Sequence, residues 1–292
     1  MSLNCTFQVN FSQNLLMKPF FIAVVFILSC FILFSCKQKP GISEAEIHFL
    51  KGNELLFSNG HTAAIKEYEA AIAADSGYWK AYYEMGGVAE LDGDFGKALQ
   101  CFSNTIKYNP DYAMGYYSRA TLEEAIGDDK GYMRDIQRCI TLKSDLFVAV
   151  FAKARSEYSR GEYKGAIQDF TDVIKIRPDC YIAYSLRGSC KFKSGDFKGA
   201  VSDYDMEVKL VPNHITGYVN RAVANGEDKN YAAALADINQ AMCIDPMWSQ
   251  AYIYRGLFNT KLNRKDSACF DFRIAMKLKN PTAENYIKEY CK

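Results

Sequence analysis

Two stretches of the chain carry nearly the same sequence. Residues 159–178 read SRGEYKGAIQDFTDVIKIRP, and residues 193–212 read KSGDFKGAVSDYDMEVKLVP. The matching positions are the pairs Gly161/Gly195, Tyr163/Phe197, Ala166/Ala200, Asp169/Asp203, Phe170/Tyr204 and Pro178/Pro212. The positions between them differ, so the chain keeps those that determine shape. A fixed internal period, here 34 residues, indicates stacked repeat units.

The period extends over most of the chain. Prolines at 110, 178, 212 and 246 keep the spacing, Ser144 stands at the skipped step, and Pro281 falls one residue late. Alanines at 98, 166, 200, 234 and 268 form a second column, and tyrosines at 82, 116, 184, 218 and 252 form a third. We therefore divide residues 45–282 into seven units: 45–78, 79–112, 113–146, 147–180, 181–214, 215–248 and 249–282.

Each unit has the pattern of a helical hairpin. In residues 181–214 the apolar and small positions recur at steps of three and four, as on one face of a helix. Gly161 and Gly195 lie in mid-unit, where a left-handed residue suits the end of a helix, and Asn59 and Asn263 are the next best residues there. The proline near the unit's end cannot continue a helix and separates one hairpin from the next.

The alanine column predicts a close contact between the two helices of a unit. An aromatic residue four positions later, such as Tyr204 after Ala200, then fills the space beside the alanine. The third unit departs most from the pattern, because Tyr132 stands in the alanine column and Ser144 replaces the proline. We expect a looser hairpin or an altered turn around residues 127–131.

The spacing of aromatic, Gly, Ala, aromatic and Pro residues resembles the tetratricopeptide repeat family. Residues 79–82, WKAY, and 98–102, ALQCF, followed by Asn109 and Pro110, fit the family pattern best. The resemblance implies an all-α fold, an α-solenoid of about seven helix-turn-helix hairpins in a right-handed superhelix. Such an array has no central core, because each unit contacts only its neighbours. Residues 283–292 are expected to form a capping helix.

The amino-terminal region has the plan of a signal peptide. Lys18 precedes an uncharged run over 19–35, and the residues LFSC at 33–36 resemble the lipobox of bacterial lipoproteins, in which the cysteine is lipidated. We therefore expect residues 17–36 to be a signal peptide with Cys36 as the lipidation site, and 37–44 to be a short linker. An uncleaved signal anchor and a cleaved secretory peptide are the alternatives. Residues 1–16 contain no Lys or Arg and are interpreted as a non-native or disordered extension.

Catalytic and cofactor chemistry have little support in the sequence. The three histidines, His48, His61 and His214, stand apart from cysteines or paired carboxylates at ligand spacing, which argues against a zinc site and a hydrolytic triad. Seven of the ten cysteines follow Cys36 without a Cys-x-x-Cys pair, so we interpret them as structural thiols. The net charge of +1, with both signs interspersed, gives no footprint for nucleic acid. We expect no enzyme activity, no cofactor and no metal.

One charged pattern recurs. Arginines at 119, 187, 221 and 255 share a column, each is followed sixteen residues later by an aspartate at 135, 203, 237 or 271, and Lys153 with Asp169 repeats the spacing. Two interpretations remain open. The arginines are a ladder that binds anions, or they pair with the aspartates between helices or across the unit boundary.

The family resemblance places ligand contacts on the first helix of each unit, along the concave face. Mapped onto this chain, the candidate peptide-binding residues are Phe49, Asn53, Phe57, Tyr83, Tyr117, Phe151, Arg155, Tyr158 and Phe192. Aromatic residues of this kind suit a peptide groove, and packing between helices is the alternative role for each of them. The family's chaperone-tail binders hold a carboxylate with a Lys and an Asn. Asn53 matches that Asn, but Phe49 replaces the Lys.

Together these features predict a non-catalytic protein-interaction scaffold. It would be a lipoprotein of the bacterial cell envelope, membrane-anchored through Cys36 and facing the periplasm, that binds a protein or peptide partner in its groove. A signal-anchored or secreted periplasmic repeat protein is one alternative. An enzyme or cofactor-binding protein on a solenoid frame is another.

Overall fold

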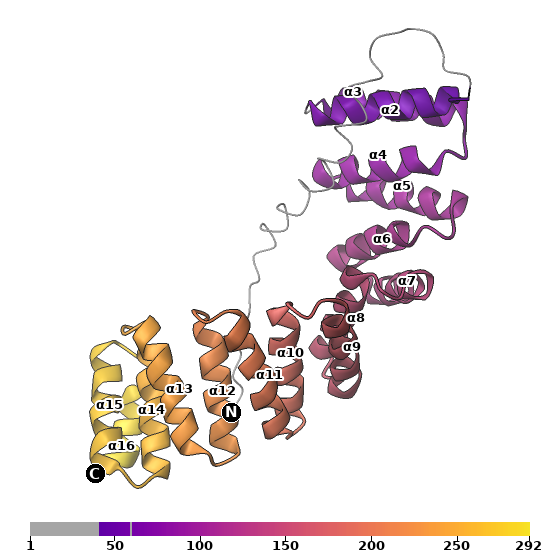
Figure 1. Cartoon of the computed structure of the whole chain (residues 1–292). Helices are drawn as coiled ribbons and strands as arrows, with labels where there is room; N and C mark the ends of the chain where they lie inside the picture. The colour runs from indigo at the N-terminus through magenta and orange to yellow at the C-terminus, as the bar shows by residue number, and fades with distance from the viewer. Residues whose placement is uncertain (1–40, 59) are drawn as a thin grey trace. The chain divides into compact units, whose positions relative to one another are not determined.

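The computed structural model describes residues 41–58 and 60–292, and these residues form fifteen α-helices without a strand. The repeated helical hairpins make the all-α solenoid that the sequence predicts (Figure 1). The chain divides into two compact units, one ending at Ala74 and the other covering Asp75–Lys292. The proposed extension at 1–16, the signal segment at 17–36 and most of the linker lie outside the described residues.

The first compact unit contains one described hairpin. Its helices are α2 (Glu44–Phe57) and α3 (His61–Ala74). The hydroxyl of Ser43 accepts a hydrogen bond from the Glu46 N–H at 3.1 Å and so begins α2. The turn residue Asn59 lies outside the described residues, so its expected left-handed conformation stays a prediction.

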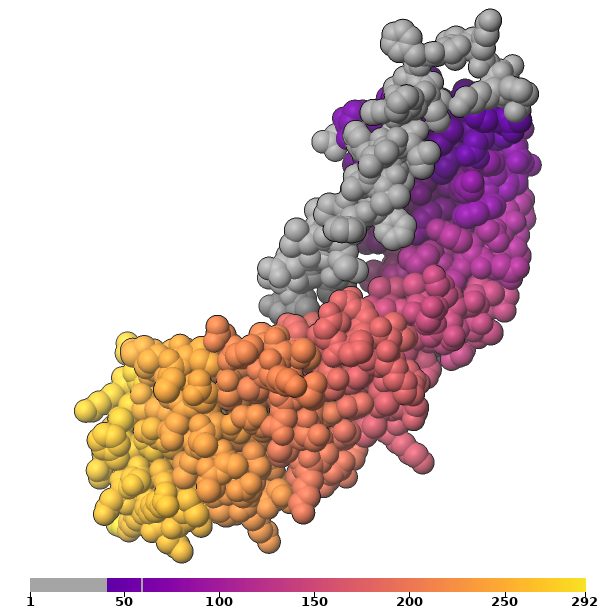
Figure 2. All heavy atoms as spheres, in the orientation of Figure 1, coloured from indigo at the N-terminus to yellow at the C-terminus, as the bar shows by residue number. Residues whose placement is uncertain are grey.

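The second compact unit contains six hairpins and a last helix. The hairpins are α4 (Trp79–Leu91) with α5 (Phe95–Tyr108), α6 (Ala113–Ile126) with α7 (Asp129–Leu142), α8 (Phe147–Ser159) with α9 (Tyr163–Ile176), α10 (Tyr181–Lys193) with α11 (Phe197–Leu210), α12 (Ile215–Glu227) with α13 (Tyr231–Ile244), and α14 (Ser249–Lys261) with α15 (Lys265–Lys277). The last helix is α16 (Ala283–Tyr290). Each hairpin packs against the next one in the chain, and the colours in Figure 2 keep this order on the surface.

The turn inside each of these hairpins depends on one left-handed residue. Gly161 and Gly195 have φ of 77° and 83°, and Asn263 has φ of 58°, so the predicted conformation is confirmed. The sequence did not single out Lys229, which occupies the same turn position with φ of 65°. The second helix then begins next to an aspartate in three hairpins. Asp196, for example, accepts a hydrogen bond from the Gly199 N–H at 2.9 Å.

The two helices of a hairpin meet through matched side-chain sizes. Ala98, Ala166, Ala200, Ala234 and Ala268 are fully buried, which confirms the predicted contact along the alanine column. Where the aromatic residue four positions after the alanine meets the first helix, that helix often carries glycine. A Cβ on Gly86 would lie 2.7 Å from the Phe102 ring, and a Cβ on Gly188 would lie 2.9 Å from the Tyr204 ring. The aromatic ring therefore fills the space that a side chain on the first helix would need.

The third hairpin, α6–α7, has the same turn as its neighbours. Gly127 is left-handed with φ of 81°, and Asp128 accepts a hydrogen bond from the Gly131 N–H at 3.0 Å. The expectation of an altered turn was therefore wrong. The bulky Tyr132 is accommodated because its ring is buried and its hydroxyl donates to the Ala152 carbonyl of α8 at 3.0 Å. Tyr132 therefore changes the contact with the next hairpin, and the turn of its own hairpin is the same as in its neighbours.

The last helix covers the end of the second unit. Ala283 of α16 is fully buried, and the Tyr286 and Tyr290 rings lie 5.4 and 6.0 Å from the Phe272 ring of α15. The outward positions of α16 are polar: Glu284, Asn285, Lys288 and Glu289. A polar outer face on a terminal helix keeps the end of a repeat array soluble.

Candidate functional site

Three of the predicted peptide-binding residues lie on α2 in the first compact unit. The Tyr68 hydroxyl donates to the Asn53 carboxamide oxygen at 2.8 Å, and the Phe49 ring lies 6.0 Å from the Tyr68 ring. Both residues therefore contact α3 of their own hairpin. Phe57, at the end of α2, is 49% exposed.

The other six predicted residues lie on first helices of the second unit. We call Tyr83, Tyr117, Phe151, Arg155, Tyr158 and Phe192 the first-helix strip. All six are half-buried. The Tyr83 ring lies 5.7 Å from the Phe102 ring, and the Phe151 ring lies 5.9 Å from the Phe170 ring. Each aromatic ring of the strip is therefore partly buried in its hairpin and partly exposed to solvent.

The polar ends of the strip connect successive first helices. The Ser118 hydroxyl of α6 donates to the Tyr83 hydroxyl of α4 at 3.4 Å, and the Tyr158 hydroxyl of α8 shares a hydrogen bond with the Ser189 hydroxyl of α10 at 3.0 Å. Between them, a guanidinium nitrogen of Arg155 on α8 donates to both carboxylate oxygens of Glu124 on α6 at 2.7 and 2.9 Å. Polar contacts therefore link α4, α6, α8 and α10 in order.

Burial affects the pKa of two tyrosines of the strip. It raises the pKa of Tyr83 and of Tyr117 above the ordinary value of a phenol. Both rings are therefore neutral near pH 7, and each presents an apolar body with a polar tip. Tyrosines of this kind are frequent at protein interfaces because they offer a large contact area and a hydrogen bond.

The recurring arginines bind the recurring aspartates in two directions. In the sixth unit, Arg221 donates through Nε and Nη2 to the two carboxylate oxygens of Asp237 at 3.0 and 2.5 Å. Its Nη1 donates to Asp205 of the preceding hairpin at 2.7 Å. We call this arrangement the arginine clamp. The other three arginines pair with their own aspartate in the same way: Arg119 with Asp135, Arg187 with Asp203, and Arg255 with Asp271.

The clamp confirms the ion-pair interpretation of the arginine column. Its third partner was not predicted, although the sequence contains a signal for it. A polar residue stands sixteen positions before each arginine, and Nη1 donates to it. These residues are Ser103, Thr171, Asp205 and Asn239. Each guanidinium thus joins its own hairpin to the preceding one and is already occupied, which leaves little capacity for an outside anion.

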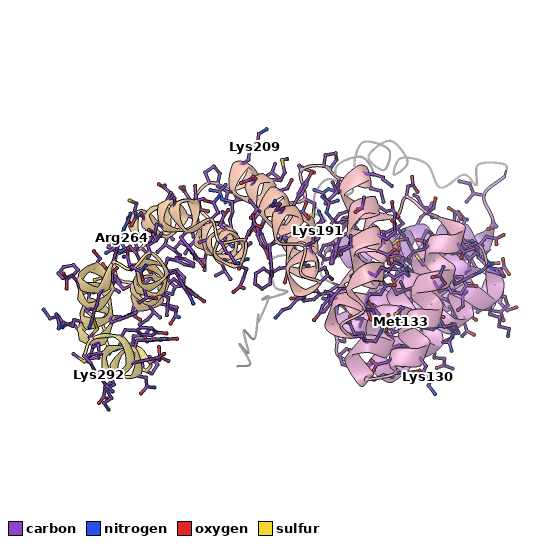
Figure 3. All side chains as sticks on the ribbon, turned by 90° about the horizontal axis from the view of Figure 1, so that it is seen from below. Lys130, Met133, Lys191, Lys209, Arg264 and Lys292 are labelled. Carbon is purple, nitrogen blue, oxygen red and sulfur yellow. A yellow bond between two sulfur atoms is a disulfide. The ribbon has the colours of Figure 1, made fainter. Side chains whose placement is uncertain are left out.

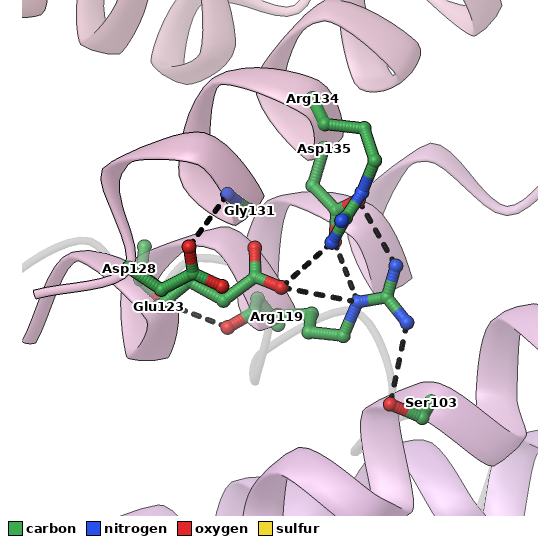
Figure 4. A network of polar contacts seen from close by, with 9 residues as sticks. Ser103, Arg119, Glu123, Asp128, Gly131, Arg134 and Asp135 are labelled. Atoms are coloured by element: carbon green, nitrogen blue, oxygen red, sulfur yellow. Dashed lines mark hydrogen bonds and ion pairs between the residues drawn. The ribbon is translucent and has the colours of Figure 1, made fainter. Parts of the chain in front are cut away.

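The clamp of the third hairpin contains an extra buried acid (Figure 4). Glu123 accepts a hydrogen bond from Arg134 at 2.9 Å, and Arg134 also donates to Asp135 at 3.1 Å. Burial and the nearby Asp135 carboxylate raise the pKa of Glu123. Its Oε2 is buried without a hydrogen-bond partner among the described residues. Sequence reasoning did not identify Glu123, because glutamate recurs in its column only once, at 157.

The junction between α7 and α8 lacks the arginine clamp. Lys153 takes the place of the arginine and contacts Asp169 at 2.5 Å and Glu157 at 3.1 Å, both within its own hairpin. Gln137 stands where the other junctions have the third partner. A lysine ammonium has three donors at one point, whereas a guanidinium spreads five donors over a plane. A cavity of about 380 Å³ lies at this junction, lined in part by Gln137 and Lys153.

The prediction of buried structural thiols needs two corrections, because Cys243 is exposed and Cys269 is not a free thiol. Cys269 of α15 and Cys291 form a disulfide, although Cys269 was expected to be a free thiol. Sequence spacing gave no sign of it, because α16 brings together residues 22 positions apart. Burial raises the pKa of Cys101 and of Cys139 to about 11, which agrees with inert structural thiols. Lys292, labelled in Figure 3, follows the disulfide directly.

Three further observations bear on the function. Among the described residues, no group of three or more His, Cys, Asp or Glu side chains could hold a metal ion. Within 41–58 and 60–292, no helix has the length and apolar character to cross a membrane. The proposed lipidation site, Cys36, lies outside the described part of the chain and stays a prediction.

Comparisons with known proteins identify the repeats. The family model described as "Tetratricopeptide repeat" matches residues 49–103 and 151–215. A stretch of 67 residues, 23% of this chain, is 33% identical to the mouse protein O-mannosyl-transferase TMTC1. The chain covers 7% of that relative's length, so the match does not extend to the relative as a whole.

Solved structures with low sequence identity have the same fold. The C-terminal part of a repeat-containing protein from Cytophaga hutchinsonii matches with a TM-score of 0.67 and 17% identity, covering 82% of this chain and 99% of that one. A tetratricopeptide repeat protein from Parabacteroides merdae matches with a TM-score of 0.54 and 16% identity, covering 85% and 99%. YrrB, described as having an unusual peptide-binding site, matches with a TM-score of 0.52 and 20% identity, covering 59% and 89%. This chain therefore has the α-solenoid fold of these structures, and residues 49–103 and 151–215 match the tetratricopeptide repeat.

Proposed function

We propose that this protein is a non-catalytic scaffold that is tethered to a bacterial envelope membrane by lipid on Cys36 and binds a peptide segment of a partner along the first-helix strip. The repeat fold is typical of protein-interaction scaffolds, and the structurally similar YrrB is described as having a peptide-binding site. The solved structures share the fold of this chain at low sequence identity, so the binding proposal is argued from the residues of this chain.

The linked first helices are the observation that carries the binding proposal. The contacts Tyr83–Ser118, Glu124–Arg155 and Tyr158–Ser189 hold four helices in register and fix the rings between them. An extended peptide that crosses these helices would meet aromatic bodies and polar tips whose positions are already set. A surface ordered before binding loses less conformational entropy when a ligand arrives.

The anchor proposal rests on the sequence around Cys36 and gains support from the disulfide. Residues 33–36 have the lipobox pattern, and Lys37, Gln38 and Lys39 offer no acidic signal for export to the cell surface. Disulfides such as Cys269–Cys291 form in oxidising compartments, of which the bacterial periplasm is one. These features favour a location facing the periplasm.

The binding proposal can be tested with a defined peptide. A peptide selected from a random library on the full chain would be measured against Arg155→Glu, which reverses the charge of the strip where α8 meets α6. We expect affinity to fall at least about tenfold, since like charges with Glu124 open the strip and a matched polar contact is lost. Lys164→Glu on the exposed side of α9 is the control with the same charge change. Equal affinity for both variants would contradict the proposal.

The anchor is tested separately. Cys36→Ala should abolish acylation of the chain and release or misprocess it, which metabolic lipid labelling and membrane fractionation would measure. Unchanged labelling would refute Cys36 as the modified residue. Protease treatment of intact cells would test the orientation, because digestion of the repeats from outside contradicts a periplasm-facing location.

A further inference from the structure

The outer side of α2 differs from the same side of every later first helix in the described chain. The third position of its repeat unit, 45–78, is Ile47, which is 40% exposed. In the later units that position holds Ala or Gly, and each of them is buried. These residues are Ala81, Gly115, Ala149, Ala183, Gly217 and Ala251. Leu50, one turn further along α2, is 43% exposed, and Ile42 just before the helix is 37% exposed.

The small residues of this column mark the side that faces the preceding hairpin. A Cβ on Gly115 would lie 2.9 Å from Ile106 of α5, and a Cβ on Gly217 would lie 3.1 Å from Val208 of α11. The column therefore has room for a methyl group at most. The larger Ile47 would overpack such a contact, so α2 is not shaped to receive another second helix of this array. The same argument disfavours end-to-end stacking of a second copy.

We infer that Ile42, Ile47 and Leu50, which we call the outer α2 face, rest on the phospholipid surface that carries the lipid of Cys36. This inference depends on the proposed lipid anchor. Helix α2 begins eight residues after Cys36, so an extended linker of about 3.6 Å per residue keeps the helix within about 29 Å of the acylated residue. At this tether length a weak apolar contact suffices, because the local concentration of lipid is high.

The charges near the outer α2 face limit how deeply it can enter. Glu44 and Glu46 lie one turn before Ile47 and Leu50 on the same side of α2, and both are in its first turn. Glu54 follows Leu50 by one turn on the same side of α2 and is exposed, so it must remain at the level of the headgroups. The face therefore docks at the interface, with its three aliphatic side chains toward the acyl chains. Shallow immersion of an amphipathic helix has this character.

Depth-dependent quenching tests the inference. The acylated full chain would be reconstituted in vesicles of phosphatidylcholine and phosphatidylglycerol that contain lipids with a nitroxide near the headgroup. The variant Leu50→Trp should be quenched several-fold more than Lys66→Trp, a control at an exposed position of α3. The unsubstituted chain supplies the background of Trp79 and Trp248. Equal quenching of the two variants would overturn the inference.

A second variant separates docking from anchoring. Ile47→Glu with Leu50→Glu should bring the quenching of an added Ile42→Trp reporter down to the control level, while flotation with vesicles and the acyl mass on Cys36 stay unchanged. Loss of the acyl mass in the unsubstituted chain would overturn both the anchor and the docking. An acylated chain whose reporter is not quenched would overturn the docking alone. A dimer in light scattering that the double substitution splits would assign the face to a second copy and so overturn the inference.

Discussion

The junctions α11/α12 and α7/α8 use the same columns of the repeat and are held in different ways. At α11/α12 the guanidinium of Arg221 contacts Asp237 of its own hairpin and Asp205 of the preceding one. At α7/α8 Lys153 pairs with Asp169 and Glu157 of its own hairpin. Two other side chains connect the hairpins there: the Tyr132 hydroxyl donates to the Ala152 carbonyl, and Arg155 of α8 binds Glu124 of α6. The comparison shows that different side chains can hold neighbouring hairpins together: a guanidinium between second helices at one junction, and a buried ring with an ion pair between first helices at the other.

The largest expected effect is at the ring. Tyr132→Ala restores the alanine of the repeat pattern, so the pattern alone would favour it. The structure predicts the opposite, because the substitution removes a buried ring and its hydrogen bond to Ala152. We expect a loss of about 3–5 kcal/mol in the free energy of unfolding, measured by urea denaturation.

The reciprocal change completes this test. Ala200→Leu places a large side chain in the same column of α11, where there is no room for it. We expect it to cost about 1–3 kcal/mol through overpacking. If Tyr132→Ala were neutral or stabilising, the ring would not contribute to the stability of the α7/α8 junction.

The next effect compares the two aspartates. Asp237→Ala leaves the half-buried Arg221 without its main partner, and we expect a loss of about 3 kcal/mol. Asp169→Ala should cost about 1 kcal/mol, since Lys153 keeps Glu157. Thermal and urea unfolding of both variants would measure the difference. If both variants lost the same free energy of unfolding, the arginine clamp would not stabilise its junction more than the lysine pair does.

A gain is expected from transplanting the clamp. Lys153→Arg offers a planar group that can reach Gln137 of the preceding hairpin as well as Asp169, and we expect about 0.5–1.5 kcal/mol of stabilisation. Arg221→Lys is the matched loss at the clamped junction. The urea midpoint of each variant measures the effect. A Lys153→Arg variant no more stable than the parent chain would show that a guanidinium at position 153 does not add a stabilising contact to Gln137.

The smallest effect is a pH dependence that belongs to the clamped α6–α7 hairpin. Burial raises the pKa of Glu123 above 4.5, so the folded state holds the proton more tightly than the unfolded state does. Protonated Glu123 therefore stabilises the folded state below pH 4.5, and this stabilisation is lost as pH rises through the pKa of Glu123 in the folded state. Glu123→Gln should make the urea midpoint fall less as pH rises through this range.

Glu67 shows the opposite shift, because His48 and Lys51 lower its pKa. Its ionised form stabilises the folded state above pH 4.5, and this stabilisation is lost as pH falls, so Glu67→Gln should remove that loss.

The fold could be predicted from the sequence because its determinants are local and repeated. The turn glycines, the alanine column and the prolines each act within about 34 residues, so a period exposes them. Lys229 was missed because lysine rarely adopts a left-handed conformation, although the 34-residue period places it in the same column as Gly195 and Asn263.

The candidate site was only partly readable. The arginine and aspartate columns gave the first half of the clamp, and the polar residue sixteen positions earlier completed it only when the distances were known. The role of Tyr132 could not be predicted, because it depends on a carbonyl of the next hairpin. The disulfide was equally hidden, since α16 returns along α15 by a turn at Lys279 that breaks the period.

That disulfide also sets the order in which the array can come apart. Repeat arrays lose structure first at their ends, where a helix has a neighbour on one side only. Cys269–Cys291 closes a covalent loop around α16, so the last helix cannot fray away while the bond is intact. While the bond is intact, α16 stays next to α15, so we expect unfolding of the array to begin at another helix. Once this bond is reduced, α16 is free to separate from α15, and unfolding can begin there.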